Sequence, residues 1–270
     1  MAGNVYQSTR DPNNYIPAPS GWTQVTGSHL TIDNSSFEAG TYTNGSDYVI
    51  AFAGTAQGVD WLANSGLATG LGADQLLDAA LYYVQLRVAH PNANISFTGH
   101  SLGGGLAALM GVFFDQATVT FDQAPFNGSV SNPIRDQIVA YLHANGYGDR
   151  VLAQYVPALA QFNINNATPR IANVTGFYVQ REVLQGLPFN TIGVQNQISH
   201  GSSVTTNPID LHSQALLNAF ALNDSFRTVT TKLPDLVKMI FDSDLFYKNP
   251  ITSLDNFIDR LVRHQVGVSA

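Results

Sequence analysis

Residues 95–111 read ISFTGHSLGGGLAALMG, and this stretch decides which fold the sequence predicts. Ile95 and Phe97 favour a short buried strand, and the apolar residues that follow the glycines recur at helical spacing. Between these two patterns lies Gly99-His100-Ser101-Leu102-Gly103, which fits the GxSxG pattern of a sharp turn from a strand into a helix. The stretch therefore predicts a strand, a tight turn and a helix, with a serine at the apex of the turn.

Ser101 is the residue that such a turn would expose. Gly99 and Gly103 flank it at the two positions where a side chain would strike the neighbouring backbone. A serine at a helix N-terminus also faces free N–H groups and the positive end of the helix dipole. Glycine-rich turns with a chance serine occur in other α/β proteins, but the strand before and the apolar helix after favour a nucleophile. We predict that Ser101 attacks acyl groups and that the Leu102 N–H helps to hold the oxyanion.

Composition and charge exclude several classes of partner and of site. The 270 residues suffice for one α/β domain, and 44% of them are hydrophobic, as in globular proteins. The formal net charge is −7, with 12 Lys and Arg that form no run, which argues against a nucleic-acid partner. Because the chain has no cysteine, disulfides, thiol nucleophiles and thiolate metal sites are excluded. We predict neither a metal nor a cofactor.

The ends of the chain leave the localisation open. The first residues, MAGNVYQSTRDPNNY, lack the charged and apolar regions of a secretory signal, and no apolar run approaches the roughly twenty residues that span a bilayer. A charged fraction of 11%, with many neutral polar residues, resembles extracellular bacterial proteins. The two alternatives that we keep are secretion without a classical signal peptide and a domain of a longer secreted protein.

Strand and helix signals alternate along the chain. Runs 37–43 and 48–53 are separated by Asn44-Gly45-Ser46-Asp47, a turn sequence that predicts a β-hairpin. The second run is apolar throughout, which is typical of a central strand. Further signals predict helices at 73–90, 133–144 and 151–162, and strands at 117–121 and 174–179. This order predicts an α/β fold with a mostly parallel central sheet flanked by helices.

Three motifs together resemble a known family. The segments AFAGT at 51–55, DWLAN at 60–64 and TGHSLGG at 98–104 resemble the class 3, fungal-lipase-like branch of the α/β-hydrolases, whose members carry FRGT, DW and GHSLGG in that order. The resemblance covers roughly residues 37–220 and implies an α/β-hydrolase fold and the cleavage of acyl esters. It also implies that Thr55 contributes to the oxyanion hole. Without the resemblance, Gly54-Thr55 favours an ordinary turn at the end of a strand. Ala53 stands where the family usually has arginine.

The family carries a lid after the residue that matches Thr55. In this chain residues 56–72 place Trp61 and Leu62 among several glycines, so that large apolar groups lie beside permissive hinges. Such a segment can cover an acyl groove and open at a lipid surface, which would give a transient membrane contact; the alternative is fixed cover of the sheet. From these signals we predict a domain organisation with an N-terminal arm at 1–36, a core at 37–225, a helical cap at 131–165, and packed C-terminal helices at 226–270.

Glu182 is the predicted acid of a catalytic triad. In this architecture the acid follows the second strand after the nucleophile, and Glu182 lies just beyond the strand signal at 174–179. The segment from Glu182 to Pro188 also resembles the family's DxVPxLP motif, with glutamate in place of aspartate. Asp122, one strand earlier, is the alternative acid, and a surface glutamate in a salt bridge is the non-catalytic alternative.

His212 is the predicted base among seven histidines. Because the base follows the acid in this chain order, His29, His90, His100 and His143 are excluded. His212 opens HSQALLNAF, which resembles the family's histidine followed by a helix, and an imidazole at a helix N-terminus remains neutral and able to accept a proton. His200 remains the alternative base, and His264 falls in a predicted terminal helix.

These residues predict a serine ester hydrolase of the triacylglycerol lipase or phospholipase A type, acting through an acyl-enzyme. The resemblance implies acyl lipids as substrates. Two alternatives stay open: an acyltransferase or thioesterase with the same triad, and a non-catalytic lipid-binding module that has kept the fold. Labelling of the serine by a fluorophosphonate separates the enzymes from the module.

Overall fold

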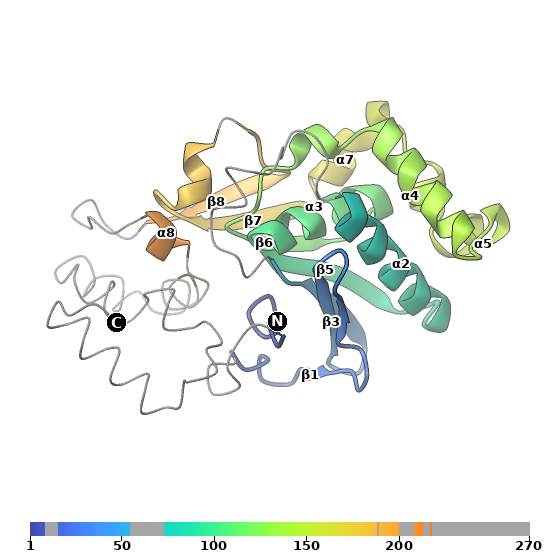
Figure 1. Ribbon diagram of the computed structural model, residues 1–270, viewed down its shortest axis with the longest axis horizontal. Helices are drawn as coiled ribbons and strands as arrows, with labels where there is room; N and C mark the ends of the chain where they lie inside the picture. Colours follow the sequence, from blue (N-terminus) through green and yellow to red (C-terminus); the bar gives the residue numbers. More distant parts are fainter. Residues whose placement is uncertain (9–15, 55–72, 188, 200–207, 213–216, 218–270) are drawn as a thin grey trace, which may run out of the picture.

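One mixed sheet organises the described part of the chain. The computed structural model describes residues 1–8, 16–54, 73–187, 189–199, 208–212 and 217. Within these residues eight strands form the sheet in the order β1-β3-β4-β5-β6-β7-β8, and β2 pairs with β3 beside this path. The pairings from β4 to β8 are parallel, whereas β3 is antiparallel to its three partners. The predicted class, a mostly parallel sheet with flanking helices, is confirmed (Figure 1).

The elements follow one another in the predicted alternation. The strands are β1 Thr23–Gln24, β2 Leu30–Ile32, β3 Phe37–Thr43, β4 Asp47–Phe52, β5 Asn94–His100, β6 Thr118–Phe121, β7 Val174–Val179 and β8 Val194–Ile198. The α-helices are α2 Ala73–Ala89, α3 Leu102–Phe114, α4 Asn132–Ala144, α5 Asp149–Tyr155, α6 Pro157–Ala160, α7 Ala167–Ile171 and α8 Pro208–Leu211. Short 3-10 helices lie at η2 Asn127–Ser129, η3 Ile164–Asn166 and η4 Val183–Gly186.

The hairpin of β3 and β4 forms because its turn residues suit a tight reversal. The side chain of Asn44 accepts hydrogen bonds from the N–H groups of Ser46 and Asp47, at 3.0 and 2.8 Å. Gly45 has a φ of 101°, a conformation that a residue with a Cβ rarely adopts. The turn therefore sets the register of β3 on β4, and β4 in turn lies against β5 in the middle of the sheet.

Helices α2 to α7 share one apolar core on one face of the sheet (Figure 1). Every residue of α3 is buried, because this helix packs between the sheet and the outer helices. Ile138 and Leu142 of α4 belong to the same apolar core as α2 and α3. The predicted helix at 151–162 is instead two short helices, α5 and α6, because Pro157 has no N–H to continue the hydrogen-bond ladder. The role of these outer helices in substrate access stays a prediction.

The beginning of the chain covers part of the opposite face. Val5 and Tyr6 are buried against Tyr42 and Ala51 of the sheet. The buried carboxylate of Glu38 on β3 accepts hydrogen bonds from the Gln7 and Ser8 N–H groups, at 2.8 and 2.9 Å, and from the Ser8 hydroxyl. The predicted arm at 1–36 is therefore anchored to the sheet, and it contributes the short strands β1 and β2.

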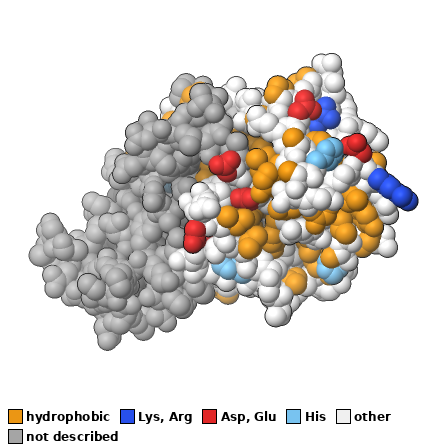
Figure 2. Space-filling view, turned by 45° about the vertical axis from the view of Figure 1, so that its right-hand side comes forward, with side chains coloured by type: hydrophobic (Ala, Val, Ile, Leu, Met, Phe, Trp, Pro, Cys, Tyr) orange, Lys and Arg blue, Asp and Glu red, His pale blue; other side chains and the backbone are white. Residues whose placement is uncertain are grey.

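Several predictions of domain organisation concern residues outside the described ranges. The predicted lid at 56–72 and the predicted C-terminal helices at 226–270 are among them, so the domain boundaries stay a prediction. No helix in the described part of the chain combines the length and the apolar character needed to cross a membrane. On the face shown in Figure 2, apolar side chains lie among separated charged side chains, and the visible Lys and Arg side chains form no patch.

Candidate active site

The turn between β5 and α3 places Ser101 directly after the carboxyl end of β5, a central strand of the sheet. Ser101 has φ 58° and ψ −126°, a strained conformation for a residue other than glycine, and its N–H donates to the Phe121 carbonyl at 3.0 Å. A Cβ on Gly99 would overlap the backbone of Gly103, and a Cβ on Gly103 would overlap the Phe52 carbonyl. Both glycines are therefore required by the close approach that the sequence predicted.

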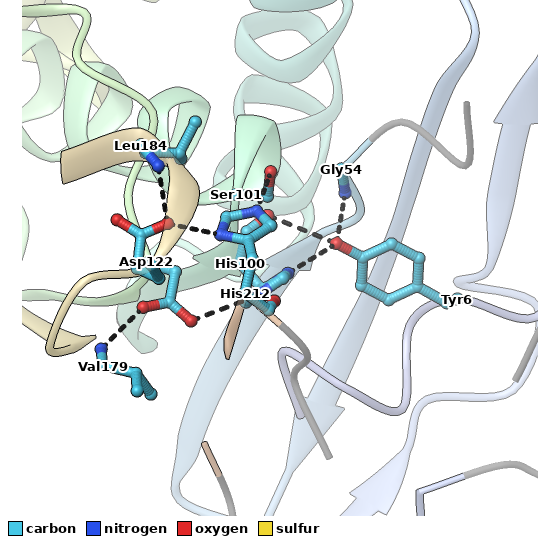
Figure 3. A network of polar contacts seen from close by, with 9 residues as sticks. Tyr6, Gly54, His100, Ser101, Asp122, Val179, Leu184 and His212 are labelled. Atoms are coloured by element: carbon cyan, nitrogen blue, oxygen red, sulfur yellow. Dashed lines mark hydrogen bonds and ion pairs between the residues drawn. The ribbon is translucent and has the colours of Figure 1, made fainter. Parts of the chain in front are cut away.

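Three of the predicted residues lie in one hydrogen-bonded line, of which Figure 3 labels Ser101 and His212. The Nε2 atom of His212 lies 2.8 Å from the Ser101 hydroxyl oxygen, and its Nδ1 atom lies 2.8 Å from Oε2 of Glu182. With Glu182 ionised, its carboxylate can only accept, so the proton of a neutral His212 resides on Nδ1 and Nε2 accepts from the Ser101 hydroxyl. This arrangement can take the hydroxyl proton as the oxygen attacks a carbonyl carbon.

The carboxylate of Glu182 is held in place by its own turn. Glu182 follows β7 and precedes η4, its N–H donates to the Val179 carbonyl at 3.1 Å, and Arg181 before it has a φ of 66°. The Leu184 N–H donates to Oε2 at 2.8 Å, the same oxygen that faces His212. The glutamate side chain is fully buried and spans the gap to the imidazole despite its extra methylene relative to the family's aspartate.

Asp122, the alternative acid, lies beside this line and is directed elsewhere. It directly follows β6, and its Oδ1 atom accepts the Val179 N–H at 2.9 Å, while Oδ2 lies 3.5 Å from Nε2 of His100. Burial and then the negative charge of Glu182 raise the pKa of Asp122 well above its ordinary value of 3.8, against the opposing effect of the Val179 N–H. The ring of His212 is therefore hydrogen-bonded to Glu182 and not to Asp122.

We expect Asp122→Asn to raise thermal stability, and the gain to grow with pH. Because the pKa of Asp122 is raised in the folded protein, the unfolded chain loses this proton first, and the stability of the parent declines as pH rises above 3.8. The asparagine has no proton to lose. A gain of about 2–4 °C in Tm, the shift that about 1 kcal/mol produces in a domain of this size, is expected near neutral pH.

The measurement is Tm by circular dichroism for the parent and Asp122→Asn, from about pH 4 to about pH 8. The difference between the two curves should widen toward higher pH. A lower Tm of the variant near neutral pH would contradict the expectation and would mean that an ionised Asp122 stabilises the fold through His100.

A residue from the chain start contacts the backbone beside the expected oxyanion hole. Leu102 is the first residue of α3, where an N–H has no carbonyl partner within the helix. Thr55 lies outside the described residues, but the N–H of Gly54 before it donates to the Tyr6 hydroxyl at 2.8 Å, and that hydroxyl in turn donates to the His100 carbonyl at 3.2 Å. Tyr6 therefore joins the end of β4 to the nucleophile turn.

Sequence reasoning missed the part that two residues play here. Tyr6 lies in a segment without motif or periodicity, so no sequence signal could have drawn attention to it. His100 directly precedes the nucleophile, and the chain-order rule excluded it as the base but gave no other role to it. Trp61, Leu62 and the alternative base His200 lie outside the described residues, so the structure does not test them.

One group of side chains has the composition of a metal site. Single ligand atoms of His100, Asp122 and His212 lie within 4.8 Å of one another. The two ring nitrogens of His212 are, however, directed at Ser101 and Glu182, and Nε2 of His100 lies 2.9 Å from the His212 carbonyl. A cation would have to replace these hydrogen bonds, so the group is better suited to hydrogen bonding than to metal coordination.

The comparison with protein families agrees with this geometry. The family model of phospholipase-like proteins, described as the Tle-like phospholipase domain, matches residues 1–201. The chain belongs to this family. Membership confirms the predicted lipase-like class and agrees with the predicted carboxylic ester hydrolase. The match begins at residue 1, so it includes the arm that the motif resemblance left out, and it ends before His212.

Individual relatives match over shorter stretches. An extracellular phospholipase A1 of Serratia liquefaciens is 42% identical over 90 residues, which are 33% of this chain and 28% of that protein. Among solved structures, the Lip2 lipase of Yarrowia lipolytica has 13% identity and a TM-score of 0.42, covering 77% of this chain and 78% of its own. A lipase of Rhizopus microsporus has 14% identity and a TM-score of 0.40, covering 66% and 62%. The family assignment comes from the family match alone.

Proposed function

We propose that this protein hydrolyses the carboxylic esters of acyl lipids, with glycerophospholipids as the first substrate class. The observation that carries the proposal is the line from Ser101 to His212 to Glu182, with 2.8 Å at each of its two contacts, at the N-terminus of a buried helix. Family membership supports a phospholipase-like activity. The name of the Serratia relative, a phospholipase A1, points to the sn-1 ester as the bond to test first.

In the proposed reaction the Ser101 oxygen attacks the ester carbonyl carbon while its proton passes to Nε2 of His212. Backbone N–H groups, that of Leu102 among them, stabilise the oxyanion, and losing one such donor typically costs roughly 2.7–4 kcal/mol. The imidazolium then protonates the departing alkoxide, which leaves as the lysophospholipid, and the acyl group stays on Ser101. Water repeats these steps in the second half, releasing the fatty acid and restoring the serine.

Glu182 has an electrostatic and an orienting role in this scheme. Its buried carboxylate holds the Nδ1–H of His212, which keeps Nε2 unprotonated and aimed at the serine before reaction. When the imidazole takes a proton, the negative charge of Glu182 lies 2.8 Å from the new cation and stabilises it. The carboxylate takes no part in the proton transfer between Ser101 and His212.

A labelling experiment tests the chemistry, and a lipid experiment tests the substrate. A fluorophosphonate probe should label the folded parent at one site, which mass spectrometry should locate at Ser101. Mixed micelles of a phosphatidylcholine with two different acyl chains should release the sn-1 fatty acid. Absence of labelling in folded protein would overturn the ester hydrolase in favour of a binding module, which was the third interpretation of the sequence.

Two other outcomes of the lipid experiment are equally informative. Labelling of Ser101 together with release of the sn-2 chain, or of fatty acid from triacylglycerol only, would replace the proposed substrate preference and leave the chemistry standing. Labelling together with acyl transfer to an added alcohol, or with cleavage of an acyl-thioester in preference to oxygen esters, would favour the acyltransferase or thioesterase. Ser101→Ala is the blank for every substrate.

A further inference from the structure

A second pair of a histidine and a carboxylate lies directly behind the proposed triad, and the proposed reaction does not use it. His100 ends β5 and precedes the nucleophile, and Asp122 follows β6, the next strand of the sheet. Both side chains are buried, at 8% and 0% of their exposed area. Two buried titratable groups this close to a reacting serine call for an explanation, because burying such groups without a role costs stability.

The ring of His100 contacts the main chain of the proposed base. Its Nε2 atom lies 2.9 Å from the carbonyl oxygen of His212 (Figure 3). A carbonyl has no proton to give, so Nε2 of His100 carries the proton and donates. The two imidazole rings lie with their centroids 4.8 Å apart, tilted by 40°. His100 therefore contacts His212 at its backbone carbonyl and along its ring, whereas the two ring nitrogens of His212 face Ser101 and Glu182.

Asp122 and Tyr6 lie at the two nitrogens of the His100 ring. Oδ2 of Asp122 lies 3.5 Å from the donating Nε2 atom, and its other oxygen is tied to the backbone of β7 through the Val179 N–H. On the other side of the ring the Tyr6 hydroxyl lies 3.4 Å from Nδ1 and donates to the His100 carbonyl. The ring that reaches His212 thus lies between Asp122, which follows β6, and Tyr6 of the chain start.

In the described part of the chain, the element directly before His212 is short. This element is α8, a helix of four residues, which is too short to be stable without tertiary contacts. The hydrogen bonds from the ring to Ser101 and Glu182 orient the imidazole but act at the far end of a side chain with two rotatable bonds. A hydrogen bond to the carbonyl acts on the main chain itself and limits the position of the Cα atom.

We propose that His100 is a positioning residue that fixes the backbone of His212 so that its imidazole lies in line between Ser101 and Glu182. The inference rests on the proposed function, since it assigns His212 as the base. It adds to that function a residue that never touches the substrate and acts only through His212. Removing the donor should therefore lower turnover and leave the binding of substrate unchanged.

The test compares three variants. His100→Phe keeps the ring and removes the donor, and His100→Gln keeps an amide donor of similar reach. His29→Phe is the matched control, because His29 forms another histidine–carboxylate pair, at 2.8 Å with Glu38, outside the site. On a soluble ester, His100→Phe should lower kcat by about 10- to 100-fold, the cost of a misplacement of about 1 Å, with little change in KM. His100→Gln should recover part of the loss, and His29→Phe should keep the parent kcat.

A second measurement does not depend on turnover. The proton shared by His212 Nδ1 and Glu182 should give a far-downfield ¹H NMR signal, assigned by its absence from His212→Ala. This signal should persist in His29→Phe and in His100→Gln, and should weaken or disappear in His100→Phe. If the parent hydrolyses no ester, the proposed function fails, but the signal still decides whether His100 positions His212.

Two outcomes would overturn the inference. One is a folded His100→Phe with the parent kcat and an unchanged downfield signal. The other is an equal loss in all three variants, which would mean a general loss of stability. Should His100→Phe fail to fold, His100→Asn takes its place, because its shorter amide cannot reach the His212 carbonyl; equal kcat values for the asparagine and glutamine variants would then contradict the proposal.

Discussion

Ser101→Ala should abolish ester hydrolysis, lowering kcat by about 10⁴-fold or more, and should leave folding intact. Residues that act as one catalytic unit lose nearly all of their contribution when the nucleophile is removed. The Ser101 hydroxyl lies 2.8 Å from Nε2 of His212, and alanine tolerates the φ of 58° about as well as serine does. The measurement is hydrolysis of a soluble ester and of phospholipid micelles, with Tm as the check on folding.

The control for this variant concerns trace contamination, which can imitate slow turnover. Fluorophosphonate labelling should be lost together with activity, and the residual rate should not change when the probe is added. Residual hydrolysis within about tenfold of the parent, in a folded and unlabelled preparation, would exclude Ser101 as the nucleophile. The family assignment would stand in that case, since it does not rest on this residue.

His212→Ala should have an effect of the same order, about 10⁴-fold or more on kcat, because the serine then has no base to take its proton. His200→Ala is the matched comparison, since both histidines follow the acid in the chain. His212 lies against Ser101 and Glu182, and His200 lies outside the described residues. The expected ranking is loss of turnover for His212→Ala and a change of less than about tenfold for His200→Ala.

The activities of His212→Ala and His200→Ala are compared only where both variants are folded. Both variants should be compared at matched Tm or at a temperature well below the lower Tm, because a packing defect lowers activity by another route. The probe-labelling rate of Ser101 should fall in His212→Ala, since the hydroxyl loses its activation, and should be kept in His200→Ala. The reverse ranking in both rate and labelling would transfer the role of base to His200.

Local sequence was enough to predict the nucleophile turn and most of the sheet. The clash that requires Gly99 and Gly103 involves residues within the turn and its neighbouring strand, and a GxSxG pattern with a strand before it and an apolar helix after it reports that geometry directly. The hairpin at Asn44 and Gly45 is likewise a matter of adjacent residues. Turn chemistry and hydrophobic periodicity act over a few residues, and these are the features that a sequence displays.

The choice among distant side chains needed the tertiary structure. Glu182 and Asp122 both follow strands and both fitted the acid, and only the packing of β6 beside β7 brings one carboxylate to the His212 ring and turns the other toward His100. His212 meets Ser101 across 111 residues of chain, and Tyr6 meets His100 across 94. The sequence by itself determined the turn, the order of the elements and a short set of candidate residues, because local sterics and periodicity specify them. The tertiary structure alone decided which candidate residues meet, because contacts between distant segments depend on how the whole sheet is assembled.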